Sequence, residues 1–158
     1  MPHPVDQIAN EFLQGRLGEM SPMKLQKLVY YAHAWSLAVF DEPLIIDRIE
    51  AWKFGPVIPT LYHEFKSFGN RKIDRLAAEL DFNSLREIPA ELPEGSSDEK
   101  ALVQKIWEIY GELTPVQLSN MTHRSSEPWS QIPKKRPGLM IPNELISRCF
   151  KAILDEQS

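Results

Sequence analysis

The sequence predicts a mainly α-helical fold: a single compact domain over residues 1–158, with a core at about 5–150, a buried central helix and room for one small β-hairpin. Three observations lead to this prediction. The 158 residues have the size of one ordinary domain, and a content of 42% hydrophobic and 25% charged residues is typical of globular proteins. Most apolar residues recur at helical spacing, with a proline or capping residue ahead of several of these runs. No change in composition marks a second domain.

The central helix contains the stretch "KLQKLVYYAHAW", residues 24–35. Ser21 is a good N-cap and Pro22 suits the first helical position, so we expect a helix from Ser21 to about Phe40, stopped by Pro43. One wide apolar arc contains Trp35, Leu28, Val39, Ala32, Leu25 and Val29, and a narrow polar strip contains Gln26, His33 and the lysines. Because a helix that is apolar nearly all round is a buried one, we interpret this helix as the centre of the core rather than as an active-site helix.

The segments around the central helix are less regular. Residues 4–15 have the spacing of an amphipathic helix. The runs "LII" and "IEAWKF", on either side of Asp47-Arg48, are interpreted as two short strands or an extended hairpin. A helix follows, with Pro56 and Pro59 suited to its first turn and Gly69 to its end.

The second half of the chain begins with residues 70–97, which are poorly patterned and are predicted to form a surface loop. Ser97 is the predicted N-cap of a helix, and Thr114 to Gln117 form a capping box for a short helix that reaches His123. A turn at "SSEPWSQI" leads into another short helix. Two apolar stripes are predicted to be buried: Leu102, Ile106, Ile109 and Leu113, and then Leu145, Ile146, Cys149, Phe150, Ile153 and Leu154.

Charge and composition exclude several classes of protein. The net charge of −4 argues against nucleic-acid binding, and we interpret the one basic cluster, residues 134–136, as a solvated loop. The single Cys149 excludes an internal disulfide and a cysteine-based zinc site within one chain. The N-terminus lacks the basic and apolar regions of a signal peptide, and no stretch has the length and apolarity of a membrane span. We therefore expect a cytoplasmic protein without contact to a membrane.

No catalytic or metal site can be assigned from the sequence, and we expect no cofactor. The histidines at 3, 33, 63 and 123 lack metal-ligand spacing, and no phosphate-binding loop or nucleophile elbow is present. The segment "THRSSEPW", residues 122–129, is the most enzyme-like. His123 could act there as a base, with Glu127 as its partner. The favoured alternative is that Thr122 and His123 bond a helix end while Glu-Pro-Trp opens the next helix.

Large aromatic side chains flank the rigid turns. Trp52, Phe54 and Tyr62 surround a Gly-Pro dipeptide, and Trp129 follows Glu-Pro. Such residues suit core anchoring or partner capture. Our candidate partner-binding residues are Phe54, Tyr62 and Trp129, although a core role is the stronger expectation for each.

Three stretches together resemble one family. "KLQKLVYYAHAW" followed by "PL", then "IEAWKFGPVIPTLY", then "LSNMTHRSSEPW" resemble the SocA-like or Panacea antitoxin domain, also known as the phage-associated GepA type. The resemblance extends from about Val5 to Phe150. The family pattern, which we expect to be structural except at the three candidate binding residues, falls on Lys24, Leu25, Gln26, Lys27, Leu28, Tyr30, Tyr31, Ala51, Trp52, Gly55, Pro56, Val57, Tyr62, Thr122, His123, Pro128 and Trp129.

This resemblance implies the antitoxin of a toxin–antitoxin pair, with no established catalytic residues. Its partner is a cognate protein toxin encoded beside it, which such proteins generally neutralise by binding. One branch of the family instead acts as a proteolytic adaptor that delivers the toxin to a ClpXP-type protease. An enzyme that reverses the toxin's modification through His123 and Glu127 is the alternative from another class of protein.

Overall fold

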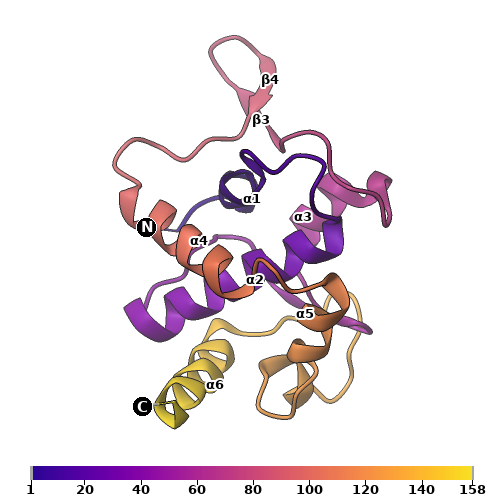
Figure 1. Cartoon of the computed structure of the whole chain (residues 1–158), viewed down its shortest axis with the longest axis vertical. Helices are drawn as coiled ribbons and strands as arrows, with labels where there is room; N and C mark the ends of the chain where they lie inside the picture. Colours follow the sequence, from indigo (N-terminus) through magenta and orange to yellow (C-terminus); the bar gives the residue numbers. More distant parts are fainter. Residues whose placement is uncertain (1, 158) are drawn as a thin grey trace.

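The computed structural model describes residues 2–157, and in this range the fold is mainly α-helical, as predicted. The long helix α2 runs through the middle, with the other helices and two small hairpins around it (Figure 1). The α-helices are α1 (Val5–Leu13), α2 (Pro22–Phe40), α3 (Pro59–Phe65), α4 (Ser97–Tyr110), α5 (Pro115–Thr122) and α6 (Asn143–Glu156). The short 3₁₀ helices are η1 (Lys66–Phe68) and η2 (Pro128–Gln131), and the strands are β1 (Glu50–Trp52), β2 (Gly55–Val57), β3 (Ala78–Asp81) and β4 (Arg86–Pro89).

Helix α2 begins and ends where the sequence predicts. The Ser21 hydroxyl accepts a hydrogen bond from the Lys24 N–H, and Pro22 occupies the first turn. Phe40 is the last helical residue, followed by Asp41 in the left-handed conformation at φ 57°. Thirteen of the residues of α2 are buried, which confirms the prediction of a central core helix.

The core is formed by α2 and the helices that pack on it. The Tyr31 ring stacks on Tyr110 of α4 at 4.7 Å between centroids, and contacts Phe150 of α6 edge to face at 5.8 Å. His33 is buried and fully bonded, as favoured from the sequence: its Nδ1 accepts from two backbone N–H groups, and its Nε2 lies 2.9 Å from the Asn143 side chain. Long-range aromatic and polar contacts thus join α2 to the second half of the chain.

Burial corrects the predicted apolar arcs at several positions. Trp35 is only half-buried, and Val39 is exposed at the end of α2. Ile109 on α4 and Leu154 on α6 are also exposed, although periodicity places both on buried stripes. The physical reason is that α4 and α6 cover the middle of α2 but do not close over its C-terminal end. Cys149 is buried, as expected.

The predicted hairpin has a different partner strand. The run "LII" forms only an isolated bridge, between Ile45 and His3, so its assignment as a strand is wrong. Strand β1 instead pairs with β2, which begins directly after the turn, with Trp52 opposite Gly55. Gly55 has φ +136°, a conformation that L side chains rarely adopt, so the chain can reverse at this glycine.

A second hairpin occupies part of the segment predicted as a loop. Strands β3 and β4 pair within residues 70–97, and the Asp81 carboxylate accepts three hydrogen bonds from Asn83 and Ser84 in the turn. The buried Asn10 side chain bonds the backbone of Ala77 and Ala90 at the base of this hairpin. This hairpin was missed because its anchor lies on α1, far away in the sequence.

The capping predictions are confirmed at α5 and shifted at α4. Thr114 and Gln117 form the expected reciprocal capping box. Helix α4 includes Ser97, and its N-cap is Ser96, whose hydroxyl bonds Pro93 O instead of capping the helix. Within residues 2–157, no helix has the length and apolarity needed to cross a membrane.

Candidate functional site

The three sequence motifs meet at Gly55, in the turn between β1 and β2. A Cβ atom added to this glycine would lie 2.7 Å from Lys27 Nζ, 3.3 Å from Thr122 Oγ1 and 3.5 Å from His123 Nε2. These neighbours come from α2 and from the end of α5, so each motif contributes one side of the junction. A larger residue here would have to displace Lys27 and Thr122, and it would also adopt a backbone conformation that L side chains rarely adopt.

The polar residues of the first motif bond the backbone of other segments. The Gln26 side chain accepts from the Ile58 N–H at 2.9 Å and donates to the Ile58 carbonyl at 3.0 Å. Lys24 donates to Gly111 O at 2.5 Å, and Lys27 donates to Pro56 O at 3.2 Å. These side chains hold the β1–β2 turn and the end of α4 against α2.

The prediction that Lys27 lies on a polar strip at the helix surface is wrong. It is 4% exposed, and within residues 2–157 it forms no ion pair with a carboxylate. Gln26 and His33 of the same strip are buried as well. The strip is covered because the β1–β2 turn and the loop after α2 pack on it. Burial lowers the pKa of the Lys27 ammonium to about 8.

The third motif holds the tip of the hairpin. His123 Nε2 donates to Phe54 O at 2.9 Å, since a carbonyl can only accept, and Trp129 Nε1 donates to Trp52 O at 2.7 Å. The His123 and Trp129 rings stack at 4.2 Å, and Lys135 Nζ lies 4.6 Å above the Trp129 ring. The expectation that His123 serves a structural hydrogen bond agrees with this geometry, although its acceptor is the hairpin rather than a helix end.

The candidate binding residues surround this hairpin. Phe54 is 71% exposed at the tip, and Tyr62 is 41% exposed and packs edge to face on Trp52 at 5.0 Å. Trp129 is half-buried beneath Lys135. We define Phe54, Tyr62 and Trp129 as the hairpin surface. Phe54 is the member with the most free apolar area.

The other motif positions are in the core or at its edge. The core contains Leu25, Leu28, Tyr30, Tyr31 and Ala51. The other buried positions are Pro56, Thr122 and Pro128, and Val57 is half-buried.

A buried acid that sequence reasoning missed supports the hairpin from below. Glu50 is 2% exposed and accepts hydrogen bonds from Trp52 Nε1 at 2.8 Å, Arg48 Nε at 2.5 Å and the Gly138 N–H at 2.8 Å. Burial raises the pKa of this carboxyl, but the three donors outweigh burial and hold it below its usual range. The alternation within "IEAWKF" was the available signal, since it places Glu50 and Trp52 on the same side of a strand.

His123 and Glu127 do not form an acid–base pair. The exposed His123 is bonded to Phe54, whereas Glu127 is 4% exposed and accepts from the Tyr31 hydroxyl at 2.8 Å. Burial raises the pKa of Glu127 to about 7. No hydrogen bond joins the two side chains in the described part of the chain. This geometry does not favour the enzyme alternative.

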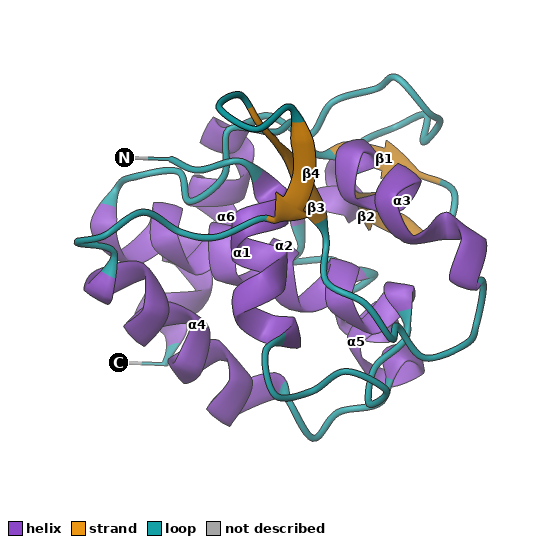
Figure 2. Cartoon of the chain, turned by 90° about the horizontal axis from the view of Figure 1, so that it is seen from above, coloured by secondary structure: helices purple, strands orange, loops and turns teal. Residues whose placement is uncertain are grey.

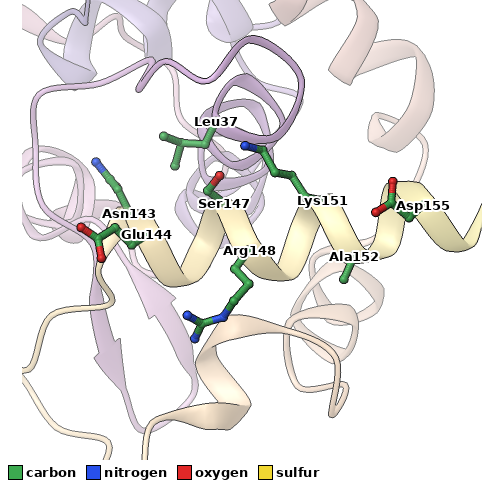
Figure 3. A pocket seen from close by; sticks show the side chains of 8 residues that line it. All are labelled: Leu37, Asn143, Glu144, Ser147, Arg148, Lys151, Ala152 and Asp155. Atoms are coloured by element: carbon green, nitrogen blue, oxygen red, sulfur yellow. The ribbon is translucent and has the colours of Figure 1, made fainter.

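A shallow hollow of about 580 Å³ lies along α6 (Figure 3). Arg148 and Lys151 point to different sides of the helix, and Lys151 pairs with Asp41 of the loop after α2. The hollow does not bring together a nucleophile and a base. Within residues 2–157, no group of three or more His, Cys, Asp or Glu side chains could hold a metal ion.

The comparisons with known proteins agree with the motif geometry. The family model described as "Antitoxin SocA-like, Panacea domain" matches residues 25–130, a range that contains all three motifs except Lys24. Antitoxin SocA from Caulobacter vibrioides is 33% identical over 113 residues, which cover 72% of this chain and 60% of that relative. The match thus spans less than two thirds of the relative's length. No solved structure matches the chain. Since the family model covers most of the chain, including every segment that meets at Gly55, the protein belongs to the SocA-like Panacea-domain antitoxin family.

Proposed function

We propose that this protein is the antitoxin of a toxin–antitoxin pair, and that it neutralises a toxin encoded by a neighbouring gene through direct binding in the cytoplasm. Family membership supports the antitoxin role. The observation that carries the binding mechanism is that polar side chains of the family motifs form hydrogen bonds to backbone atoms instead of facing solvent. Lys27, Gln26 and His123 bond the backbone around the β1–β2 turn, so they form a rigid support under an exposed aromatic ring.

Phe54 has the properties of an interface anchor. Its carbonyl is held by His123, and Lys27 donates to the carbonyl of Pro56 two residues further along the same turn. A ring on such a fixed turn loses little conformational entropy when a partner covers it. Tyr62 and Trp129 extend the same surface, and aromatic residues dominate binding energy at interfaces. We therefore place the toxin contact on the hairpin surface.

The function is tested by co-expression. The neighbouring gene is expressed alone and together with this protein, followed by a growth assay and co-purification. Growth arrest that this protein relieves, together with a stable complex, supports the proposal. Rescue in a strain lacking ClpX and ClpP indicates sequestration, while rescue only when the protease is present indicates a proteolytic adaptor. A neighbour that is harmless by itself and never co-purifies would overturn the antitoxin function.

The interface is tested with two phenylalanines of similar exposure. Phe54→Ala should weaken toxin binding at least tenfold, about 1.4 kcal/mol or more, because it removes a central aromatic anchor. Phe82, 81% exposed in the turn between β3 and β4, is the matched control, and Phe82→Ala should change Kd less than threefold, or about 0.6 kcal/mol. Calorimetry on the purified proteins gives both constants. Equal effects of the two substitutions would contradict the placement of the toxin on the hairpin surface.

A further inference from the structure

An apolar groove of about 970 Å³ lies at the C-terminal end of α2, between that helix, α4 and α6. Its exposed apolar side chains are Val39 and Phe40 on α2, Ile109 on α4 and Leu154 on α6, each 40–60% exposed. The half-buried Trp35 forms part of its wall. We call this the α2–α4–α6 groove. A continuous apolar hollow of this kind is typical of a binding site, because single exposed apolar residues are ordinary but gathered ones are not.

The groove is separate from the hairpin surface. Lys27, under the hairpin, precedes Val39 by twelve residues on α2, which corresponds to about 18 Å along a helix. In Figure 1 the free end of α2 lies between the start of α4 and the end of α6, whereas α5 lies toward the other end of α2. Figure 2 likewise shows the C-terminus close to α4 and away from α5. The two surfaces can therefore contact different parts of one partner.

The charges around the groove favour a cationic occupant. Among the residues that the structure describes, its lining contains the carboxylates of Glu42, Asp98 and Glu99 and one ammonium, that of Lys105. Glu99 is bonded to His3 at 2.5 Å, and Asp98 is exposed in the first turn of α4. Helices α2 and α6 also end at this groove, and the C-terminal end of a helix attracts positive charge. Helix α4 begins there, but its positive N-terminal end already faces Asp98 and Glu99 in its first turn. A second copy of this chain, with a net charge of −4, matches this field poorly.

We infer that the α2–α4–α6 groove binds an amphipathic helix of the toxin, with an apolar face and lysine or arginine beside it. This inference rests on the proposed function and adds a second contact to it. The groove follows α4 from Asp98 to Ile109, about 18 Å, which a helix of about twelve residues spans. Apolar side chains at i, i+4 and i+7 of that helix fill the groove. Its basic residues lie toward Asp98.

The first experiment uses a synthetic probe and the full chain. The probe is a 14-residue amphipathic peptide of leucine and lysine, and its control has glutamate in place of every lysine. Fluorescence anisotropy should show at least tenfold tighter binding of the lysine peptide. Ile109→Asp and Phe40→Asp should each weaken that binding at least tenfold, and Asp98→Lys at least threefold. Both aspartates replace side chains more than half exposed, so circular dichroism should show an unchanged fold.

The control variant is Val116→Asp on α5, at a residue that is 65% exposed and lies outside the groove. It should leave the affinity for the lysine peptide unchanged. Equal affinity for both peptides overturns the inference, and so does equal loss of binding in Val116→Asp and Ile109→Asp. If Ile109→Asp unfolds the chain, Phe40→Asp takes its place, and equal loss of binding in Phe40→Asp and Val116→Asp overturns the inference.

The second experiment separates this inference from the proposed function. In the co-expression assay, Ile109→Asp and Phe40→Asp should reduce toxin co-purification and rescue, while Val116→Asp should not. Full rescue and co-purification by both groove variants overturns the groove contact and leaves the antitoxin function standing. A wild-type chain that neither rescues nor co-purifies overturns the proposed function and, with it, the assignment of the groove to a toxin helix.

Discussion

Gly55→Ala is the substitution that tests most directly how the three motifs cooperate. The glycine has φ +136°, and a methyl group there would lie 2.7 Å from Lys27 Nζ and 3.3 Å from Thr122 Oγ1. The ammonium is the end of a flexible side chain, but Lys27 is 4% exposed and donates to Pro56 O. Because this side chain is buried, moving its ammonium away from the methyl group costs that hydrogen bond without a compensating bond to bulk water.

The magnitude follows from two contributions. An L residue in this backbone conformation costs about 1–3 kcal/mol. Displacing the ammonium from its carbonyl acceptor adds about 1.5–3 kcal/mol, the range for a hydrogen bond from a charged donor. We expect Gly55→Ala to lower the free energy of unfolding by about 3–5 kcal/mol, which for a domain of this size lowers Tm by about 6–20 °C.

The assay is urea denaturation at pH 7, with Lys27→Met as the second member of a double-mutant cycle. Methionine is one atom shorter than lysine and carries no charge, so it frees the space that the alanine methyl group needs. Gly55→Ala should therefore cost about 2 kcal/mol less in the Lys27→Met background, leaving only the backbone strain. A cost below about 1 kcal/mol in the wild type, or the same cost in both backgrounds, would refute the close contact at Gly55.

Three further predictions concern pH, packing and metals. The pKa of the Glu127 carboxyl rises from 4.5 in the unfolded chain to about 7 in the fold. The free energy of unfolding is therefore highest below pH 4.5, where the carboxyl is protonated in both states, and it falls by about 3 kcal/mol as pH rises from there through 7. Glu127→Gln keeps an acceptor for Tyr31 and should remove this loss, measured as a smaller fall in urea midpoint between pH 4.5 and 8. Trp35→Ala should cost about 3 kcal/mol in the same assay, because it removes the edge-to-face contact with Phe150 and the hydrogen bond to Tyr110, and a cost below about 1 kcal/mol would show that the ring adds little packing. Dialysis against a chelator should leave the melting temperature unchanged within about 1 °C, since we expect no structural metal; a fall of many degrees would reveal an undetected site.

Local chemistry was sufficient to predict most helices. The Ser21 and Thr114 hydroxyls each accept from an N–H of the first helical turn, and Pro22 and Pro115 lack an N–H that would need a partner. These effects arise within one segment, so they can be predicted without knowledge of the fold. The Asp81 turn between β3 and β4 is equally local, but two short strands without a buried stripe give a weak pattern. That hairpin depends on Asn10, a contact between distant segments.

The candidate site was only partly predictable. The sequence identified the motif residues and the aromatic candidates, because Gly-Pro and Glu-Pro turns stand out against the helical pattern. It did not show that Gln26 and Lys27 turn inward, since periodicity places them on a polar strip whose covering segments come from elsewhere in the chain. The exposure of Ile109 was missed for the opposite reason: its stripe is apolar, but none of the segments within residues 2–157 covers it.

By itself, the sequence determined the helical class, the limits of α2, the absence of an internal disulfide or a cysteine-based zinc site, and the family resemblance. These properties depend on residue type and short-range spacing. The tertiary structure decided which strand pairs with β1, which polar side chains are buried, and where apolar surface remains open. Each of these depends on which distant segments pack together. Gly55 illustrates the difference: its place in the sequence predicts a turn, but only the fold brings Lys27, Thr122 and His123 against it.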